Sequence, residues 1–305
     1  MANSLAAYVT KFTNKLDETV LKDTCTADLN MNQDLLGELS GAGEIKVAKM
    51  ALSGLADHTR GNGFTRGSIN IDWETLKLAY DRDREFSIDS LDDEELDAVV
   101  SANVMKEFAR EEVVPEVDAI RFAKLAAKSG TTVAKSLSSA DDALAAILTA
   151  EEAIEDLGGD LSKCLLYCTS GFKTLLRKAQ KYDLNQGEDP NGRFKTFDDM
   201  KIVTVPQTRF YTAIDLLDGV TKTGSGETLV DETGGGFKKA STAKNINFMV
   251  VDPRATAAIV KHRKLRYFAP DTNQGDDAHL WQYRIFHDLL VYEKKKGLIY
   301  THTVA

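Results

Sequence analysis

The chain contains 305 residues, of which 43% are hydrophobic and 28% charged, a composition typical of a folded globular protein rather than a disordered chain. No uncharged stretch approaches the ~20 residues of a membrane-spanning helix, and the N-terminus lacks the basic and apolar regions of a secretion signal. The net charge of -9 argues against binding nucleic acid through the whole surface. Three cysteines, an odd number, predict free thiols and a reducing compartment.

The N-terminal region is predicted to be an arm. Apolar residues recur at helical spacing from Leu5 and predict a one-faced helix that ends near Lys22. The segment from there to Gly43 is polar and glycine-containing. Because a one-faced helix needs a partner to cover its apolar side, residues 1–43 are expected to form an arm rather than a domain.

Residues 44–80 are predicted to form a long β-hairpin, because apolar side chains alternate along both halves of this segment. The alternation changes phase after Trp73, and we expect a β-bulge at Glu74 and Thr75 to restore it. The tip, residues 58–67, is rich in glycine and cationic, and it is expected to be mobile unless another surface binds it.

A single long helix is predicted between residues 92 and 129. Asp92 and Glu95 resemble a capping box, and apolar residues follow at helical spacing. Pro115 lies inside this helix, so we expect a kink or a restart there, because the proline ring removes one backbone donor and crowds the preceding turn.

From Ser138 onward the pattern becomes that of an α/β unit. Asp252 followed by Pro253 predicts the start of a helix, because a capping residue before proline is favoured at that position. Residues 217–244 are rich in glycine, threonine and lysine and predict a long surface loop. The other predicted elements are a helix from Ser139 to Gly158, a buried strand at 164–169, a helix at 172–179, strands at 200–205 and 246–251, and aromatic-rich β structure at 280–304.

Few residues suggest metal binding. Cys164 and Cys168 are spaced for one face of a strand, but no second Cys or His pair completes a zinc site, which favours two buried thiols. The acidic residues of 81–85 mimic the start of a calcium loop, yet Phe86 stands where that loop requires glycine. The alternating charges of 81–85 favour ion pairs between surfaces instead.

Catalytic patterns are equally sparse. His287 and Asp288 are neighbours in a predicted strand and point to opposite faces, which favours a structural histidine over a catalytic base. The glycine clusters do not match phosphate-binding loops, and the sequence contains neither a hydrolase nucleophile elbow nor a zinc-protease helix motif. Much of the chain belongs to a predicted arm, a hairpin and a long helix whose apolar surfaces the chain itself cannot cover. This predicts contacts with neighbouring subunits.

Several segments of the sequence resemble the major capsid proteins of tailed bacteriophages. They occur in the family's order and together cover most of the chain. The segments are 54–64, 73–75, 81–89, 113–122, 268–270, 283–288 and 297–300.

This resemblance implies an α+β architecture, the Hong Kong 97 capsid fold. Its implied parts are an N-terminal arm (1–43), an extended loop (44–88), the spine helix of a peripheral domain (89–138), an axial domain (139–262) and the C-terminal strands of the peripheral domain (263–305). The resemblance further implies hexamers and pentamers that assemble into an icosahedral virion shell around double-stranded DNA, with no enzymatic activity, cofactor or metal.

The resemblance also implies partners. The prototype of the fold begins with a scaffolding segment, whereas only a short arm precedes the loop here, so a separate scaffolding protein is expected. A portal protein is a further implied partner, and the presence of decoration or minor capsid proteins is left open. No membrane partner is expected. Assembly is expected in the host bacterial cytoplasm. The lysine–asparagine crosslink of the prototype cannot be placed in this sequence, which predicts non-covalent contacts.

Six residues are the candidates for contacts between subunits, and two other functions remain open. An encapsulin-type compartment has the same fold and encloses enzyme cargo, whereas a cytoplasmic α/β enzyme would use His287 or the residues around Gly234. The acidic surplus is expected on exposed and lumen-facing surfaces and the arginines at subunit contacts, because a shell has to release its DNA. The contact candidates are Arg60, Phe64, Arg66, Arg82, Arg84 and Glu85.

Overall fold

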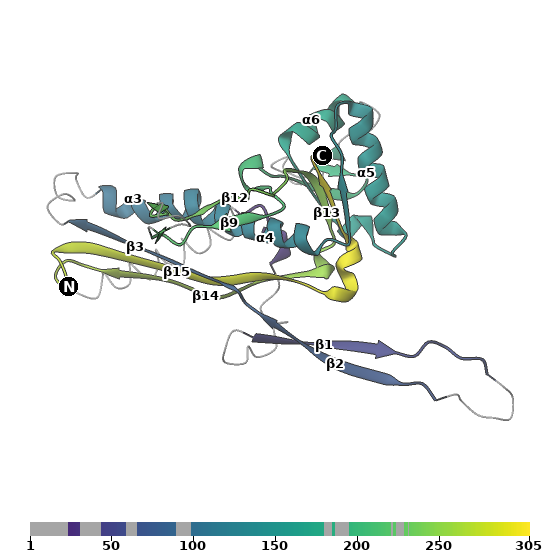
Figure 1. Cartoon of the computed structure of the whole chain (residues 1–305), viewed down its shortest axis with the longest axis horizontal. Helices are drawn as coiled ribbons and strands as arrows, with labels where there is room; N and C mark the ends of the chain where they lie inside the picture. Colours follow the sequence, from purple (N-terminus) through teal and green to yellow (C-terminus); the bar gives the residue numbers. More distant parts are fainter. Residues whose placement is uncertain are drawn as a thin grey trace.

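The body of the protein is built on two β-sheets joined by one long helix (Figure 1). The computed structural model describes residues 24–30, 44–58, 66–89, 99–179, 185–186, 195–220, 222–223, 229–230 and 232–305. The predicted N-terminal helix from Leu5 and the capping box at Asp92 lie outside these residues. No helix in the described ranges is long and apolar enough to cross a membrane.

A three-stranded antiparallel sheet forms the elongated half of the body. Its order is β14 (Thr256–Phe268), β15 (Ala278–Val291) and β3 (Tyr80–Asp89). Along β3 burial alternates residue by residue, so one face of the sheet is covered and the other is exposed. The covered face packs on the long helix through an apolar cluster. This cluster includes Met105, Val113, Val117, Trp281, Tyr283 and Ile285.

The long helix runs along the three-stranded sheet and continues to the second sheet (Figure 1). It consists of α3 (Val99–Phe108), a π-helical turn (Ala109–Val113) and α4 (Val114–Lys128). The irregularity expected at Pro115 is therefore present as a π-helical turn directly before it. A proline in this position lacks the backbone N–H that a regular turn would use, so the hydrogen-bond spacing changes there.

A seven-stranded mixed sheet forms the other half, in the order β4-β16-β13-β5-β8-β7-β6. Alternate residues of its central strands face opposite cores: Leu166 and Phe248 pack under α5 (Ala140–Glu155) and α6 (Ser170–Lys178), whereas Tyr167 packs with Phe122 of α4. The strands are β4 (Thr131–Ala134), β5 (Leu165–Cys168), β6 (Asn185–Gln186), β7 (Lys195–Phe197), β8 (Met200–Thr204), β13 (Ile246–Val251) and β16 (Ile299–Thr303).

Three two-stranded ribbons complete the described strands. They are β1 (Glu44–Leu52) with β2 (Ile69–Lys77), β9 (Ile214–Leu216) with β12 (Phe237–Lys239), and β10 (Lys222–Thr223) with β11 (Leu229–Val230). The first ribbon projects from the body, and the second lies beside the long helix (Figure 1). The region expected to be a long surface loop is therefore partly paired.

The helix predicted after Asp252 and Pro253 is wrong. The chain makes a single 3-10 turn at Pro253–Ala255 and then enters β14. Asp252 does cap this turn by accepting a hydrogen bond from Arg254 N, so its role as a capping residue is confirmed. The following residues, 256–268, pair with β15 along almost their whole length, and this tertiary pairing overrides the start signal.

The β-bulge predicted at Glu74 and Thr75 is also wrong, because β1 and β2 pair in unbroken register from Glu44 opposite Lys77 to Leu52 opposite Ile69. The change of phase has another cause. The strand ends at Lys77, and the next strand, β3, begins at Tyr80 in a different sheet.

The elements predicted around α5 are confirmed. Ser139 and Asp142 form a reciprocal capping box at its start, and Gly158 follows its end with a φ of 74°, a conformation that favours glycine. Further along the chain, β16 pairs with β13 and β4 in the seven-stranded sheet rather than with β14 and β15. Residues 299–303 therefore belong structurally with the strands of 139–262.

Candidate functional site

The hairpin of β1 and β2 projects from the body (Figure 1), and the chain carries exposed apolar side chains there. Leu55 is fully exposed, and Leu52, Ile69 and Ile71 are 65%, 69% and 49% exposed. Beyond the paired strands, Ser53 and Ser68 hydrogen-bond to each other and extend the ribbon. A projecting ribbon with exposed apolar residues is typical of a surface that another chain covers.

Of the three candidates at the hairpin tip, Arg66 is described and is exposed. Arg60 and Phe64 lie outside the described residues. Their contact with another subunit, like that of Arg66, stays a prediction.

The base of the hairpin is attached to the body by an apolar contact and by a hydrogen bond to a buried carboxylate. Leu78 is buried with Ile259 and Leu290, and the N–H of Ala79 donates to Asp288 Oδ2 at 3.1 Å. Asp288 is fully buried and accepts two hydrogen bonds from Lys124 of α4. The junction between β2 and β3 is therefore fixed to β15 and to the long helix.

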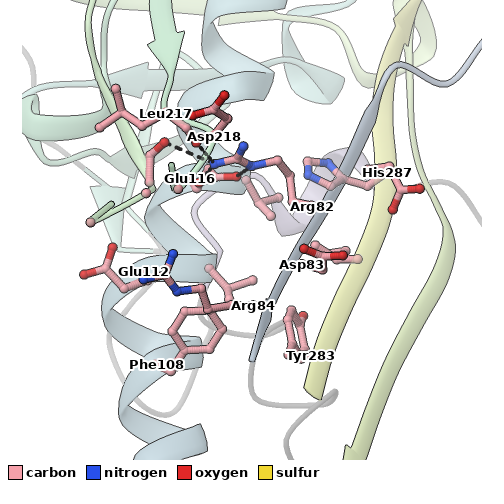
Figure 2. Close-up of a pocket in the computed structure, with 18 residues that line it drawn as sticks. Arg82, Asp83, Arg84, Phe108, Glu112, Glu116, Leu217, Asp218, Tyr283 and His287 are labelled. Atoms are coloured by element: carbon pink, nitrogen blue, oxygen red, sulfur yellow. Dashed lines mark hydrogen bonds and ion pairs between the residues drawn. The ribbon is translucent and has the colours of Figure 1, made fainter. Parts of the chain in front are cut away.

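Arg82 joins three separate elements. Its Nε and Nη2 atoms bind the two carboxylate oxygens of Glu116 on α4 at 2.7 and 3.2 Å. Nη2 also donates to the carbonyl oxygens of Leu217 and Gly236, at 2.7 and 3.2 Å, in the segment between β9 and β12 (Figure 2). A planar guanidinium has five N–H donors in a rigid fork that binds both oxygens of a carboxylate, whereas the lysine ammonium has three donors on a flexible stem.

Arg84 lies beside the same segment. Its Nη2 donates to the carbonyl oxygen of Thr233 at 2.9 Å, and its Nη1 lies close to Gly219, where a Cβ atom would approach it to 3.0 Å. Gly219 also has a φ of 81°, so both space and backbone favour glycine there. Glu85, on the opposite face of β3, accepts a hydrogen bond from Gln282 at 2.6 Å.

The structure thus places Arg82, Arg84 and Glu85 in contacts within the chain. The two arginines line a cleft of about 280 Å³ between β3, the π-helical turn and the β9–β12 segment (Figure 2). A further contact of these residues with another copy stays a prediction.

The residues named for an enzyme, His287 and Gly234, also line this cleft. His287 is fully buried and stacks on Tyr80, with ring centroids 6.1 Å apart. Its neighbour Asp288 is held by Lys124. A catalytic base has to reach its substrate, and a fully buried imidazole beside a committed carboxylate is poorly placed to do so.

A second anchor, which the sequence did not indicate, holds residues 24–30 on the body. Asp118 of α4 is fully buried and accepts hydrogen bonds from Cys25 N, Thr26 N and the Thr26 hydroxyl, and it pairs with Arg209. Arg121 donates to the same hydroxyl at 2.9 Å. Both residues are charged, and a charged residue on a helix is usually solvated, so the sequence alone does not reveal this buried site.

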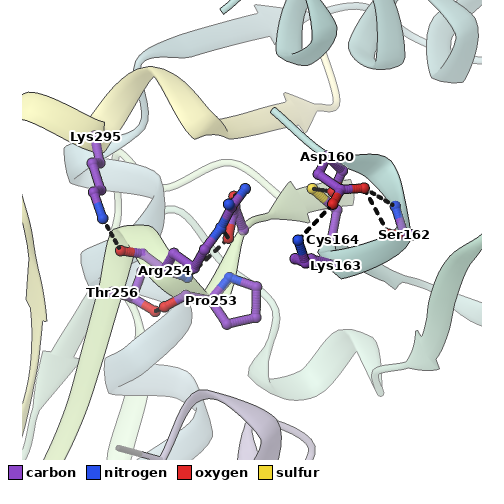
Figure 3. Close-up of polar contacts among 9 residues, drawn as sticks. Asp160, Ser162, Lys163, Cys164, Pro253, Arg254, Thr256 and Lys295 are labelled. Carbon is purple, nitrogen blue, oxygen red and sulfur yellow. Dashed lines mark hydrogen bonds and ion pairs between the residues drawn. The ribbon is translucent and has the colours of Figure 1, made fainter. Parts of the chain in front are cut away.

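The cysteines behave as buried thiols. Burial raises the pKa of Cys164 to about 11 and that of Cys168 to about 12. The Cys164 thiol donates to the carbonyl oxygen of Asp160, whose carboxylate pairs with Lys163 (Figure 3). Within the described ranges, no group of three or more His, Cys, Asp or Glu residues could hold a metal ion.

The whole fold is similar to solved virus-shell structures. A structure of Mycobacterium phage Che8 is 13% identical, with a TM-score of 0.53, over 92% of this chain and 90% of that chain. The mature capsid of bacteriophage PhiM1 is 14% identical, with a TM-score of 0.56, over 88% and 84%. A virus-like particle from Pyrococcus furiosus is 12% identical, with a TM-score of 0.54, over 96% and 98%.

No protein-family model and no curated protein matches the sequence. The structural likeness covers 88–96% of this chain and 84–98% of the three solved chains. The chain therefore has the α+β fold of these capsid proteins, the Hong Kong 97 fold that its sequence resembles.

Proposed function

We propose that this chain is the major capsid protein of a tailed double-stranded DNA phage. Hexamers and pentamers of the chain assemble into an icosahedral shell around the packaged genome. The observation that carries this proposal is the projecting hairpin, whose exposed apolar residues Leu52, Leu55 and Ile69 have no cover in a single copy. The fold of the whole chain, which is similar to that of phage capsid structures, supports the same conclusion.

The function is structural rather than enzymatic. Each contact between copies is modest, and closed symmetry repeats it many times, so the shell is stable through avidity. In this proposal the arm (1–43) and the extended loop (44–88) reach neighbours. Residues 139–262, with strand β16 added to their sheet, form the axial domain, and residues 89–138 and the rest of 263–305 form the peripheral domain. A scaffolding protein and a portal protein act with the chain in the host cytoplasm.

The decisive experiment reverses charge at the hairpin tip. Arg60→Glu combined with Arg66→Glu leaves a folded, soluble subunit but blocks shell closure, which electron microscopy and sedimentation of the expressed protein measure. The matched control is Lys238→Glu with Lys244→Glu, two exposed cations of the body, which leaves shell formation intact. Normal particles from the tip variant would contradict the assignment.

A second function is favoured by one comparison. The virus-like particle from Pyrococcus furiosus is similar over 98% of its chain, and a compartment that encloses enzyme cargo would need the same shell contacts. The contents of particles purified from the native source separate the two functions. Nuclease-protected double-stranded DNA supports the phage capsid, whereas a stoichiometric second protein without DNA supports the compartment.

A further inference from the structure

The hairpin meets the described body at one junction. Among the described strands, β1 and β2 pair only with each other, and Figure 1 shows the ribbon leaving the body without a sheet beside it. The junction is the pair of residues between β2 and β3, Leu78 and Ala79. Whatever holds these two residues sets the direction of the whole ribbon.

An ion pair between the fully buried Asp288 and the partly exposed Lys124 holds that junction. Asp288 is fully buried, and its side chain accepts hydrogen bonds from Lys124 Nζ at 2.5 and 2.6 Å and from Ala79 N at 3.1 Å. Lys124 Nζ also lies 4.9 Å from the ring centroid of Tyr80, the first residue of β3. One carboxylate thus connects the hairpin base, β15 and the long helix.

Such a pair is an expensive way to stabilise a fold. Taking the Asp288 carboxylate out of water costs desolvation energy that largely offsets its attraction to Lys124, whose side chain is 28% exposed, and apolar replacements of such pairs are often neutral or stabilising. Its directional hydrogen bonds, however, admit one geometry, whereas apolar contacts such as those of Leu78 tolerate sliding. The pair is therefore suited to fixing an orientation.

We infer that Asp288 and Lys124 are positioning residues that fix the angle at which the hairpin leaves the body. This much concerns the single chain. The consequence for assembly rests on the proposed function: the fixed angle sets where the hairpin meets the next copy and hence the uniformity of the shell.

The length of the hairpin makes this angle important. The nine residues of β2 span about 30 Å at about 3.4 Å per residue. A change of about 10° at the junction moves the far end of β2 by about 5 Å, more than the separation of two atoms in contact. A small loss of order at Asp288 is therefore amplified at the surface that meets a neighbour.

The test measures the hairpin angle in dilute, unassembled full-length chains. Nitroxide labels are placed at Leu55→Cys on the hairpin and Thr149→Cys on α5, both exposed, in a Cys25→Ser background with Cys164 and Cys168 buried. Pulsed electron resonance then gives the distribution of distances between the labels. We expect a narrow distribution for the parent chain and one at least twice as wide for Asp288→Asn.

Two further variants separate orientation from stability. Lys124→Met combined with Asp288→Asn removes both charges, so its thermal stability should return toward that of the parent while the distance distribution stays wide. Asp252→Asn is the matched control, because Asp252 is equally buried and pairs with Arg254 rather than with a residue of the hairpin junction. It should leave the distribution narrow.

An unchanged distribution in Asp288→Asn, or a narrow one in the double variant, would overturn the inference. Particle images of the same variants address the assembly step. Irregular or mixed-size particles from Asp288→Asn, beside uniform ones from the parent, are expected, and uniform particles from both would contradict that step. If the parent chain forms no shells at all, the proposed function fails while the distance measurements still decide the role of the pair.

Discussion

Thr26 places its hydroxyl between two buried charges of the long helix. The hydroxyl donates to Asp118 Oδ1 at 2.7 Å and accepts from Arg121 Nη1 at 2.9 Å, and the residue is fully buried. Asp118 also pairs with Arg209, a contact that does not involve the N-terminal segment. Thr26 thus completes a polar site that the body already provides.

Replacing this hydroxyl should weaken the anchor without changing the shape of the side chain. Thr26→Val leaves two buried polar partners short of one hydrogen bond each, and we expect a loss of about 1–3 kcal/mol in the free energy of unfolding. Urea denaturation measures it. Thr149→Val removes an exposed hydroxyl of α5 that bonds only the Ala145 carbonyl and should cost little. Equal losses in both variants would contradict the role of Thr26.

Glu151 of α5 gives the stability a pH dependence. Burial, followed by the nearby charges of Asp198 and Glu155, raises the pKa of Glu151 to about 7 from its ordinary 4.5. The unfolded chain releases this proton above about pH 4.5, whereas the folded chain keeps it until about pH 7. Folding therefore loses stability as the pH rises through this window, and the loss is complete above it.

Glu151→Gln should remove that dependence. We expect the variant to gain melting temperature over the parent chain at pH 8 and to lose this advantage near pH 4.5, as differential scanning calorimetry would measure. Glu152→Gln changes the exposed neighbour on the same helix and should change the melting temperature by the same amount at both pH values. A constant difference between Glu151→Gln and the parent at all pH values would disprove the assignment.

The sequence was least informative about charged residues that act inside the fold. Asp118 and Arg121 occupy helical positions whose charge predicts a solvated face, and only the docking of residues 24–30 turns them into a buried site. Arg82 lies in an alternating run of charges that predicts ion pairs between surfaces, and in the structure it pairs with Glu116 within the chain, so its contact with another copy stays a prediction. Its partner Glu116 lies on a different element, and a charge pattern along one segment does not name partners in another.

At the scale of elements, the segment between β9 and β12 depends on arginine contacts from β3. Arg82→Met removes the hydrogen bonds to the carbonyl oxygens of Leu217 and Gly236 as well as the pair with Glu116. We expect amide hydrogen exchange in residues 214–220 and 232–239 to become at least tenfold faster.

The matched control for that change is Arg284→Met. Arg284 pairs with Asp81 on the exposed face of the same sheet, where the two side chains are 56% and 42% exposed. Exposed ion pairs contribute little, so exchange in the β9–β12 segment should stay at the parent rate. Slow exchange in Arg82→Met would show that other contacts hold the segment.

Element boundaries were predictable where local chemistry decides them. The capping box of Ser139 sets the start of α5, and strong alternation sets the two strands of the hairpin. The failures share one cause. A cap followed by Pro253 is compatible with a 3-10 turn as well as with a helix. The phase change after Trp73 is compatible with the end of a strand as well as with a bulge. In both cases pairing with the distant strand β15 determines the structure that forms.

At the scale of the molecule, charge is distributed in rows. The exposed side of β3 carries Asp81, Asp83 and Glu85, whereas Lys264 and Arg266 are exposed on β14 at the other edge of the same sheet. The placement of acidic residues on the lumen side of a shell stays a prediction. Two of the predicted contact arginines, Arg82 and Arg84, already have partners within the chain.

The hairpin links the single chain to the shell through its exposed apolar residues. Leu55 is fully exposed in one copy, so Leu55→Ser removes no contact from the folded subunit and should leave its melting temperature unchanged. If assembly buries this side chain, each copy loses about 1.5–3 kcal/mol of burial. The protein concentration needed for assembly should then rise about 10- to 100-fold.

Light scattering of a dilution series measures this threshold, and scanning fluorimetry measures the subunit. Val220→Ser is the control, because Val220 is 53% exposed on the β9–β12 segment rather than on the hairpin. A threshold that rises only for Leu55→Ser assigns the effect to the hairpin. The same shift in both variants would mean that assembly responds to general surface polarity, and the exposed leucines of the ribbon would then not explain how the copies hold together.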